Sequence, residues 1–170
     1  MRHIAEKERN FRMKLNSFDE VKRLTQEMVA IPSINKEPGG ETAVARYIYD
    51  FYMGLDYFKE HPERTKIFKT KNDFVDRHST YAYVKGTKGN SNRTVILIGH
   101  LDTVGVDDFG TIREYAFKCE ELPEKLKETF KLSDEVLADI ESGEYMFGRG
   151  ALDMKSGVSY VSDKVFLRAS

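Results

Sequence analysis

The sequence has a single cysteine, Cys119, so it cannot form a disulfide within the chain. It also lacks long apolar runs, since the longest strongly apolar stretch, residues 95–98, is far shorter than the ~20 residues of a membrane-spanning helix. The charged residues 1–9 contain no apolar stretch of the kind found in secretory signals. These absences exclude a disulfide-rich secreted class and predict a cytoplasmic protein with no membrane partner.

Neither sign of charge dominates, because 27 Lys and Arg residues face 28 Asp and Glu residues, for a formal net charge of -1. Such a balance gives no overall field that would attract nucleic acid or an anionic membrane, so neither is expected as a partner. The chain has 170 residues, of which 40% are apolar. This is enough for one hydrophobic core and too little for two, so one domain or part of one is predicted.

Two segments carry apolar residues at helical spacing. The first, residues 18–30, directly follows Ser17, which forms a capping-box pattern with Glu20 that is typical of a helix N-terminus. The second begins after a Pro-Gly-Gly turn and runs to about Gly54. A shorter helix capped by Ser133 is expected later, within a charged stretch of weak periodicity.

Two segments are rich in strand formers, residues 80–85 and 94–98. A connection rich in Gly and Asn joins them, which predicts a hairpin-like pair. The second segment is apolar throughout and does not alternate, a pattern typical of a strand with both faces covered. Together with the helices, these strands predict an α/β fold layered as helix, sheet and helix.

A histidine and a carboxylate follow the second predicted strand. His100 and Asp102 are two residues apart, so an extended backbone would point both side chains to the same side. Imidazole is a common zinc ligand, and a nearby carboxylate can accept a hydrogen bond from its second ring nitrogen. The same spacing also suits a hydrogen-bonded pair that closes a strand, and the triplet alone does not separate these readings.

A second acidic position, Asp153, lies in a glycine-punctuated loop ahead of an expected helix. Asp153 or Ser156 could cap that helix, or the Asp153 carboxylate could bridge two metal ions. The Gly-Arg-Gly sequence at residues 148–150 lacks the spacing of a P-loop or a dinucleotide site, so nucleotide binding is rejected. Asp107 and Asp108 are adjacent acids after a glycine and are typical of a solvated turn.

The runs GHLDTV at residues 99–104 and GRGALDMKSG at residues 148–157 resemble the two N-terminal signatures of a zinc peptidase family. This family, often called peptidase family M-twenty, contains aminoacylase-1, acetylornithine deacetylase, succinyl-diaminopimelate desuccinylase and glutamate carboxypeptidase. The segments at residues 104–110 and 142–150 further resemble its arginine-utilisation (RocB-type) branch. The resemblance extends from about Ser17 to about Gly157.

The resemblance implies that His100 binds one zinc, that Asp153 bridges two zincs, and that Asp102 orients the His100 imidazole. It also implies a cis peptide between Asp153 and Met154. The glutamate general base and the remaining ligands of the family would lie beyond the bridging aspartate. Residues 1–170 would then be an incomplete N-terminal portion of the catalytic domain, without the dimerisation or lid domain and the C-terminal catalytic half.

The expected function is therefore that of a truncated metal-dependent hydrolase of amide or peptide bonds in small amino-acid derivatives or peptides, inactive as this chain. The alternative is a non-enzymatic module that binds metal weakly or pairs with a full-length relative, with self-association into a homo-oligomer as a further expectation. The other histidines, His3, His61 and His78, stand in charged or polar surroundings and are predicted to be surface residues.

Overall fold

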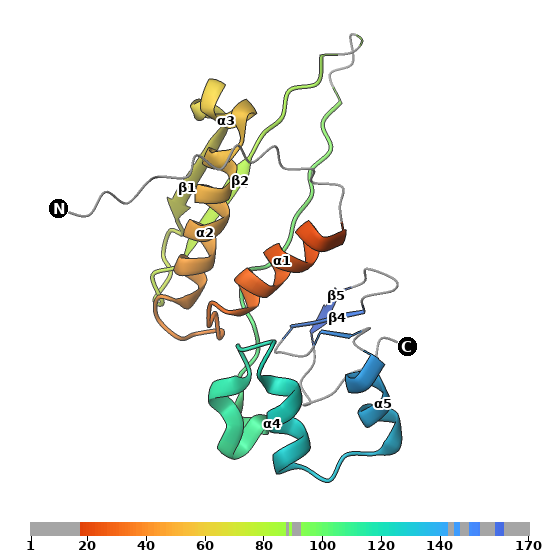
Figure 1. The fold of residues 1–170 in the computed structure, drawn as a ribbon. Coiled ribbons are helices and arrows are strands. Elements are labelled where there is room, and N and C mark those ends of the chain that lie inside the picture. The colour runs from red at the N-terminus through yellow and green to blue at the C-terminus, as the bar shows by residue number, and fades with distance from the viewer. Residues whose placement is uncertain are drawn as a thin grey trace, which may run out of the picture.

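The computed structural model describes residues 18–87, 89, 93–142, 145–146, 150–153 and 159–161, and it confirms the predicted α/β class (Figure 1). None of the helices in these ranges is long and apolar enough to cross a bilayer. In chain order the elements are α1 Phe18–Val29, α2 Gly40–Gly54, α3 Asp56–Glu60, the 3-10 helix η1 Pro62–Arg64, β1 Thr65–Lys69, β2 His78–Ala82, the 3-10 helix η2 Asp107–Tyr115, α4 Leu122–Thr129, α5 Asp134–Ser142, β3 Tyr145–Met146, β4 Gly150–Asp153 and β5 Ser159–Val161.

Both long helices predicted from apolar spacing are present as α1 and α2. The proposed cap Ser17 lies outside the described residues. Within α1, Arg23 forms ion pairs with Glu20 and Glu27, one turn away on either side. The Tyr47 hydroxyl on α2 donates a hydrogen bond to the Glu27 carboxylate, so one polar chain connects the two helices.

α2 packs on a two-stranded sheet formed by β1 and β2. The strands are antiparallel, with Thr65 opposite Ala82 and Lys69 opposite His78. Val44 and Ala45 of α2 are buried. The strand predicted at residues 80–85 is present as β2, whereas β1 was not predicted from the sequence. The predicted pairing of this strand with residues 94–98 was wrong, because β2 pairs with β1.

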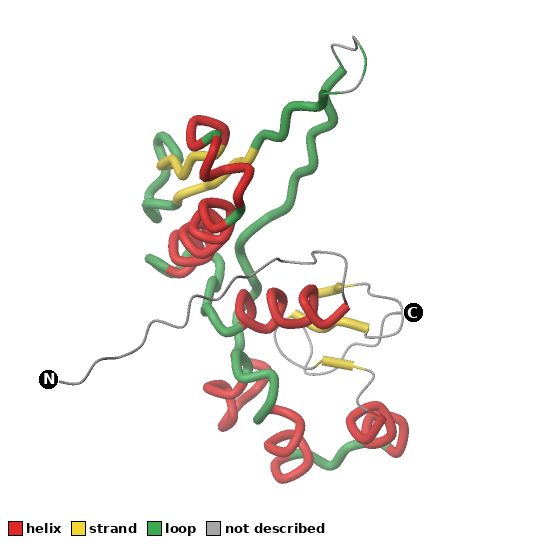
Figure 2. Tube along the Cα trace, turned by 45° about the horizontal axis from the view of Figure 1, so that its top comes forward, coloured by secondary structure: helices red, strands yellow, loops and turns green. Residues whose placement is uncertain are grey.

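Residues 94–98 extend without regular pairing, in contrast to the covered strand predicted there. Figures 1 and 2 show the chain leaving β2 along an extended leg and returning through this segment. Its apolar side chains, Val95 to Ile98, are 76–92% exposed. Strand propensity favours the extended backbone but supplies no neighbouring strand, and no described helix covers the segment. Fully burying four such side chains would stabilise the fold by roughly 1.5–3 kcal/mol each.

The stretch from residue 106 onwards, predicted as an elaboration, holds the largest described core. Here η2 and α4 pack together, and Phe109, Leu122 and Leu126 are completely buried. Ile34 from the N-terminal part also packs against this cluster. The predicted helix after Ser133 is present as α5, and the Ser133 hydroxyl accepts a hydrogen bond from the Val136 N–H at 3.4 Å.

The link between α1 and α2 gives a prediction for Tyr47→Phe. Burial, followed by the hydrogen bond to Glu27, raises the pKa of Tyr47 from 10.0 to about 12. A raised pKa means that the hydrogen bond stabilises the fold fully below pH 10 and that this contribution is lost as pH rises through about 12. We expect Tyr47→Phe to lower the free energy of unfolding by about 1 kcal/mol at pH 8, and the deficit to shrink above pH 10.

Urea unfolding of both proteins from pH 8 to pH 11 measures this difference. Tyr49→Phe is the matched control. Tyr49 lies on the same helix, and its contact with Arg46 is made through the aromatic ring, which the substitution keeps. Equal midpoints for the wild-type protein and Tyr47→Phe at pH 8 would contradict the prediction.

Candidate functional site

A short parallel contact places the predicted His-Asp pair beside the segment that follows α1. The Thr103 N–H donates to the Ser33 carbonyl at 2.8 Å, and the Asn35 N–H donates to the Thr103 carbonyl at 2.8 Å. Ile34 and Thr103 thus form an isolated parallel bridge. Residues 32 and 33 are fixed from the other side by α2, because a Cβ at Gly40 would lie 2.2 Å from the Pro32 carbonyl oxygen. Only glycine permits this approach.

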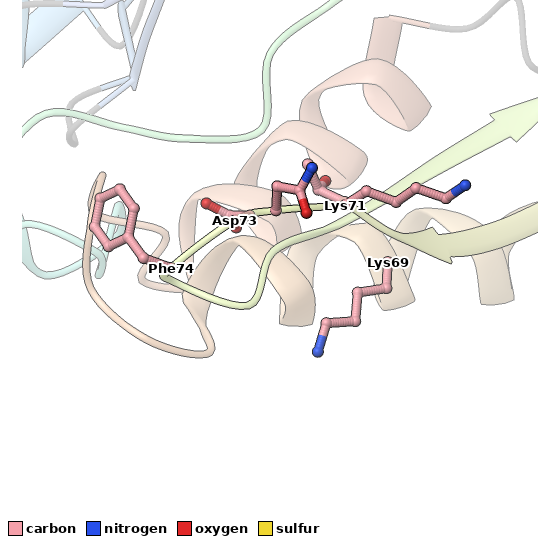
Figure 3. A pocket seen from close by; sticks show the side chains of 6 residues that line it. Lys69, Lys71, Asp73 and Phe74 are labelled. Carbon is pink, nitrogen blue, oxygen red and sulfur yellow. The ribbon is translucent and has the colours of Figure 1, made fainter.

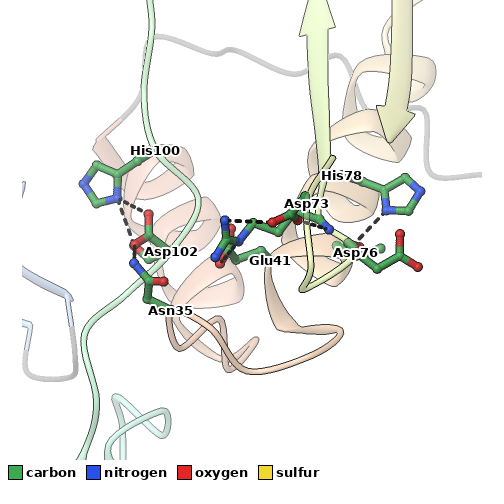
Figure 4. Close-up of polar contacts among 9 residues, drawn as sticks. Asn35, Glu41, Asp73, Asp76, His78, His100 and Asp102 are labelled. Atoms are coloured by element: carbon green, nitrogen blue, oxygen red, sulfur yellow. Dashed lines mark hydrogen bonds and ion pairs between the residues drawn. The ribbon is translucent and has the colours of Figure 1, made fainter. Parts of the chain in front are cut away.

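Three polar side chains meet at the bridge (Figure 4). Asn35 Nδ2 donates to Asp102 Oδ2 at 2.7 Å. His100 Nδ1 lies 3.1 Å from Asp102 Oδ1 and 2.9 Å from the Asp102 carbonyl oxygen. Asp102 therefore contacts Asn35 with one carboxylate oxygen and His100 with the other.

These contacts define the tautomer of His100. Both atoms near Nδ1 are acceptor oxygens, so Nδ1 carries the proton and donates it. In the neutral ring, Nε2 then holds the lone pair. The His100 side chain is 71% exposed and that of Asp102 31%, so the ring is accessible from solvent. The geometry leaves Nε2 of His100 available to a ligand from solvent, such as a metal ion.

The contact between His100 and Asp102 expected from their spacing is present. It agrees with both readings of the sequence, a ligand with its orienting carboxylate and a pair that closes a strand. Asn35 was missed. It lies 67 residues from Asp102 along the chain, and no local motif around it predicts a contact over that separation.

Asp153 is the last residue of β4 and stands opposite Tyr145 of β3. Its side chain, Met154, the peptide between them and Ser156 lie outside what the structure describes. The helix expected after this motif is wrong over residues 159–161, which form β5 antiparallel to β4. Tyr160 and Val161 are strand formers, and the pairing with β4 overrides the helical spacing of the valines.

Among the described side chains, no group of three or more His, Cys, Asp or Glu residues comes together in a way that could hold a metal ion. His61 packs its ring against Tyr57 at 5.0 Å and is 37% exposed. His78 is half-buried on β2, with its Nδ1 3.1 Å from the Thr42 hydroxyl. His3 lies outside the described residues. Asp107 and Asp108 are exposed at the start of η2.

Burial raises the pKa of the lone cysteine, Cys119, to about 11, which disfavours its thiolate form.

A shallow pocket lies on the turn between β1 and β2, lined by residues 69–74 (Figure 3). An ion pair attaches this turn to α2, with Arg77 Nε 3.0 Å from Glu41 Oε1 and Arg77 Nη1 3.2 Å from Asp73 Oδ1 (Figure 4). The hydrogen bond from Lys69 lowers the pKa of Asp76 on the same turn. These charges are paired with one another, and neither His100 nor Asp102 lines the pocket.

Two curated proteins of Bacillus subtilis (strain 168) are similar to this chain. The chain is 38% identical to Protein RocB over 145 residues, which is 85% of this chain and 25% of RocB. It is a relative of RocB. Identity to the Uncharacterized protein YqjN is 35% over 141 residues, which is 82% of this chain and 25% of YqjN. The chain therefore spans about a quarter of the length of these relatives.

No protein-family model matches the chain, and no solved structure is significantly similar to it. A span of 145 residues in a chain of 170 can begin no later than residue 26 and can end no earlier than residue 145. The similarity to RocB therefore covers Asn35, His100 and Asp102.

The tautomer of His100 can be tested directly. Long-range ¹H–¹⁵N NMR of the imidazoles should show Nδ1 protonated in His100 at a pH where the ring is neutral. Asp102→Ala removes one of the two acceptors near Nδ1, so the Nδ1–H fraction should fall. His61, whose ring packs on Tyr57, serves as the reference in the same spectra. A wild-type His100 protonated at Nε2 would contradict the assignment.

Proposed function

We propose that this chain carries a zinc-binding segment of a hydrolase that cleaves amide or peptide bonds in small amino-acid derivatives or peptides. The observation that supports this most is the orientation of His100, whose Nδ1 donates to Asp102 and whose Nε2 lone pair is open to solvent. The similarity to RocB supports the RocB-type branch indicated by the sequence, and with it a role in arginine utilisation.

In this proposal each residue has a separate task. His100 binds zinc through Nε2, and Asp102 holds the ring in the required tautomer. Asn35 holds the Asp102 carboxylate by donating to its other oxygen. The carboxylate of Asp153 would help to hold zinc, a role assigned by the resemblance alone. When bound, zinc would polarise the scissile carbonyl and lower the pKa of a bound water to about 7.

The described residues supply one imidazole with its orienting carboxylate, which would form part of a zinc site. A catalytic zinc uses three protein ligands and a general base close to the bound water. The remaining groups are proposed to belong to a longer polypeptide of the RocB type. Activity is therefore assigned to that assembly, and the cytoplasm is its proposed location.

A second candidate function is that of a non-enzymatic module that pairs with a full-length relative. The exposed apolar residues 95–98 favour it, since they form a surface suited to a protein partner. Both functions share this chain's metal-binding histidine but differ in whether the assembly turns over a substrate.

Zinc binding tests the role of His100. In calorimetric titrations of the 170-residue chain with zinc, His100→Ala should remove the binding, because no other described side chain offers an equivalent nitrogen at this position. Asp102→Asn should weaken it by about 10–100-fold, since it disturbs the partner of Nδ1.

His61→Gln is the matched control and should bind zinc as the wild-type chain does. The role of His100 would be refuted if His100→Ala bound zinc with unchanged affinity while the protein remained folded by circular dichroism.

Turnover is a separate prediction. The 170-residue chain supplied with zinc should not hydrolyse N-acyl amino acids, because its described residues provide one zinc-binding imidazole. Release of the free amino acid, followed by its reaction with an amine reagent, measures this. Turnover that is abolished by His100→Ala would show instead that this chain is a complete hydrolase.

A further inference from the structure

The backbone between α1 and α2 is paired along one of its sides. Ser33 and Asn35 share two hydrogen bonds with Thr103, each 2.8 Å long. The Glu37 N–H closes the turn that follows by donating to the Ile34 carbonyl at 3.0 Å. Ser33 is only 2% exposed. This backbone is therefore fixed by a distant segment of the chain as well as by its own turn.

On its other side, the same backbone touches the first residue of α2, Gly40. A Cβ at this position would lie 2.2 Å from the Pro32 carbonyl oxygen and 2.9 Å from Ser33 Cα. Both are backbone atoms, so no rotation of a side chain could relieve the overlap. Glycine has no Cβ and permits the approach.

The first turn of α2 is tied to the segment that leads into β2. Glu41 Oε1 lies 3.0 Å from Arg77 Nε in an ion pair. The Thr42 hydroxyl donates to the Asp76 carbonyl oxygen at 3.2 Å. Because these contacts hold α2 in place, a side chain at position 40 would displace the backbone that precedes the helix.

A displacement of that backbone would reach His100 through one side chain, Asn35. Asn35 Nδ2 donates to Asp102 Oδ2 at 2.7 Å, and His100 Nδ1 donates to Asp102 Oδ1 at 3.1 Å (Figure 4). A shift of about 1 Å is enough to break the first bond. The Asp102 carboxylate could then rotate, and Nδ1 would keep only the Asp102 carbonyl oxygen as a fixed acceptor.

We propose that Gly40 and Asn35 are positioning residues for His100. Gly40 lets the backbone before α2 reach Thr103, and Asn35 then holds the carboxylate of Asp102. That carboxylate selects the Nδ1–H tautomer, which leaves the Nε2 lone pair open to a ligand. The tautomer follows from the geometry alone, whereas the zinc assigned to Nε2 rests on the proposed function. The first turn of α2 thus controls an imidazole that is distant from it in the sequence.

Long-range ¹H–¹⁵N NMR of the metal-free chain tests Asn35. Asn35→Ala should lower the ratio of the Nδ1–H to the Nε2–H form of neutral His100 by about 2–10-fold, the change that loss of one ordinary hydrogen bond allows. Asn35→Asp keeps the shape but sets an oxygen against the Asp102 carboxylate, so the ratio should fall at least as far. An unchanged ratio in Asn35→Asp would overturn the proposal, because a role in packing alone survives that substitution.

Glu37→Ala is the matched control for Asn35→Ala. Glu37 is exposed on the same turn, and the substitution keeps the bond from its N–H to the Ile34 carbonyl. The His100 ratio should equal that of the wild-type chain.

Gly40→Ala tests the path from α2 in the same spectra. It should lower the His100 ratio as the loss of the Asn35 amide does. His78 reports on α2 itself, because its Nδ1 lies 3.1 Å from Thr42 Oγ1, and its signals should not move. An unchanged His100 ratio, or a shift of the His78 signals, would refute the path from Gly40.

Two further variants sharpen the test of Gly40. Gly54→Ala is the matched control at the other end of α2, where a Cβ would meet no atom within 4 Å, and it should leave His100 unchanged. The double variant Gly40→Ala/Asn35→Ala should show no larger loss than Asn35→Ala alone, because both changes act through one hydrogen bond. Losses that add would contradict the proposal.

Calorimetry with zinc separates the positioning role from the proposed function. Asn35→Ala should weaken zinc binding at least about 2-fold, but by less than the ~10–100-fold expected for Asp102→Asn. If the wild-type chain binds no zinc while Asn35→Ala still changes the tautomer, the proposed function fails and the positioning role stands. If both chains bind zinc alike and share one tautomer ratio, the positioning role fails and the proposed function stands.

Discussion

Two backbone hydrogen bonds, from the Thr103 N–H to the Ser33 carbonyl and from the Asn35 N–H to the Thr103 carbonyl, join the parts of this molecule that otherwise have separate cores. On one side, α2 packs on β1 and β2, and on the other, η2 packs on α4. The side chain of Ile34, which is part of the bridge, packs against the apolar core formed by η2 and α4. The connection is therefore apolar as well as polar. The position of Asp102 next to Asn35 is a direct result, since each stands beside a bridged residue. The candidate site depends on this contact more than on either core.

Elements that depend on short-range interactions were predicted from the sequence, whereas those that depend on long-range pairing were not. α1, α2 and α5 were predicted because helical spacing and caps are read within a few residues. β1 was missed, and residues 94–98 were given the wrong partner, because strand pairing depends on segments that propensity does not specify. Residues 159–161 show the same effect, where pairing with β4 overrides the spacing of the valines.

The contacts of the candidate site likewise differ in whether the sequence predicted them. The contact between His100 and Asp102 follows from the period of an extended chain, so two residues of spacing were enough to predict it. Asn35 could not be found, because its contact with Asp102 requires the fold that brings the two segments together. Asp153 was singled out from its motif, and its place at the end of β4 differs from the loop that the glycines predicted. Glycine tolerates many conformations, so its presence near residue 150 did not select among them.

His100 follows Ile98 by two residues, which in an extended chain is a distance of about 7 Å. Any neighbouring strand that satisfied the backbone of Ile98 would therefore bring its own terminal side chains next to the imidazole. Sheet formation and the approach of further side chains to His100 would then be a single event.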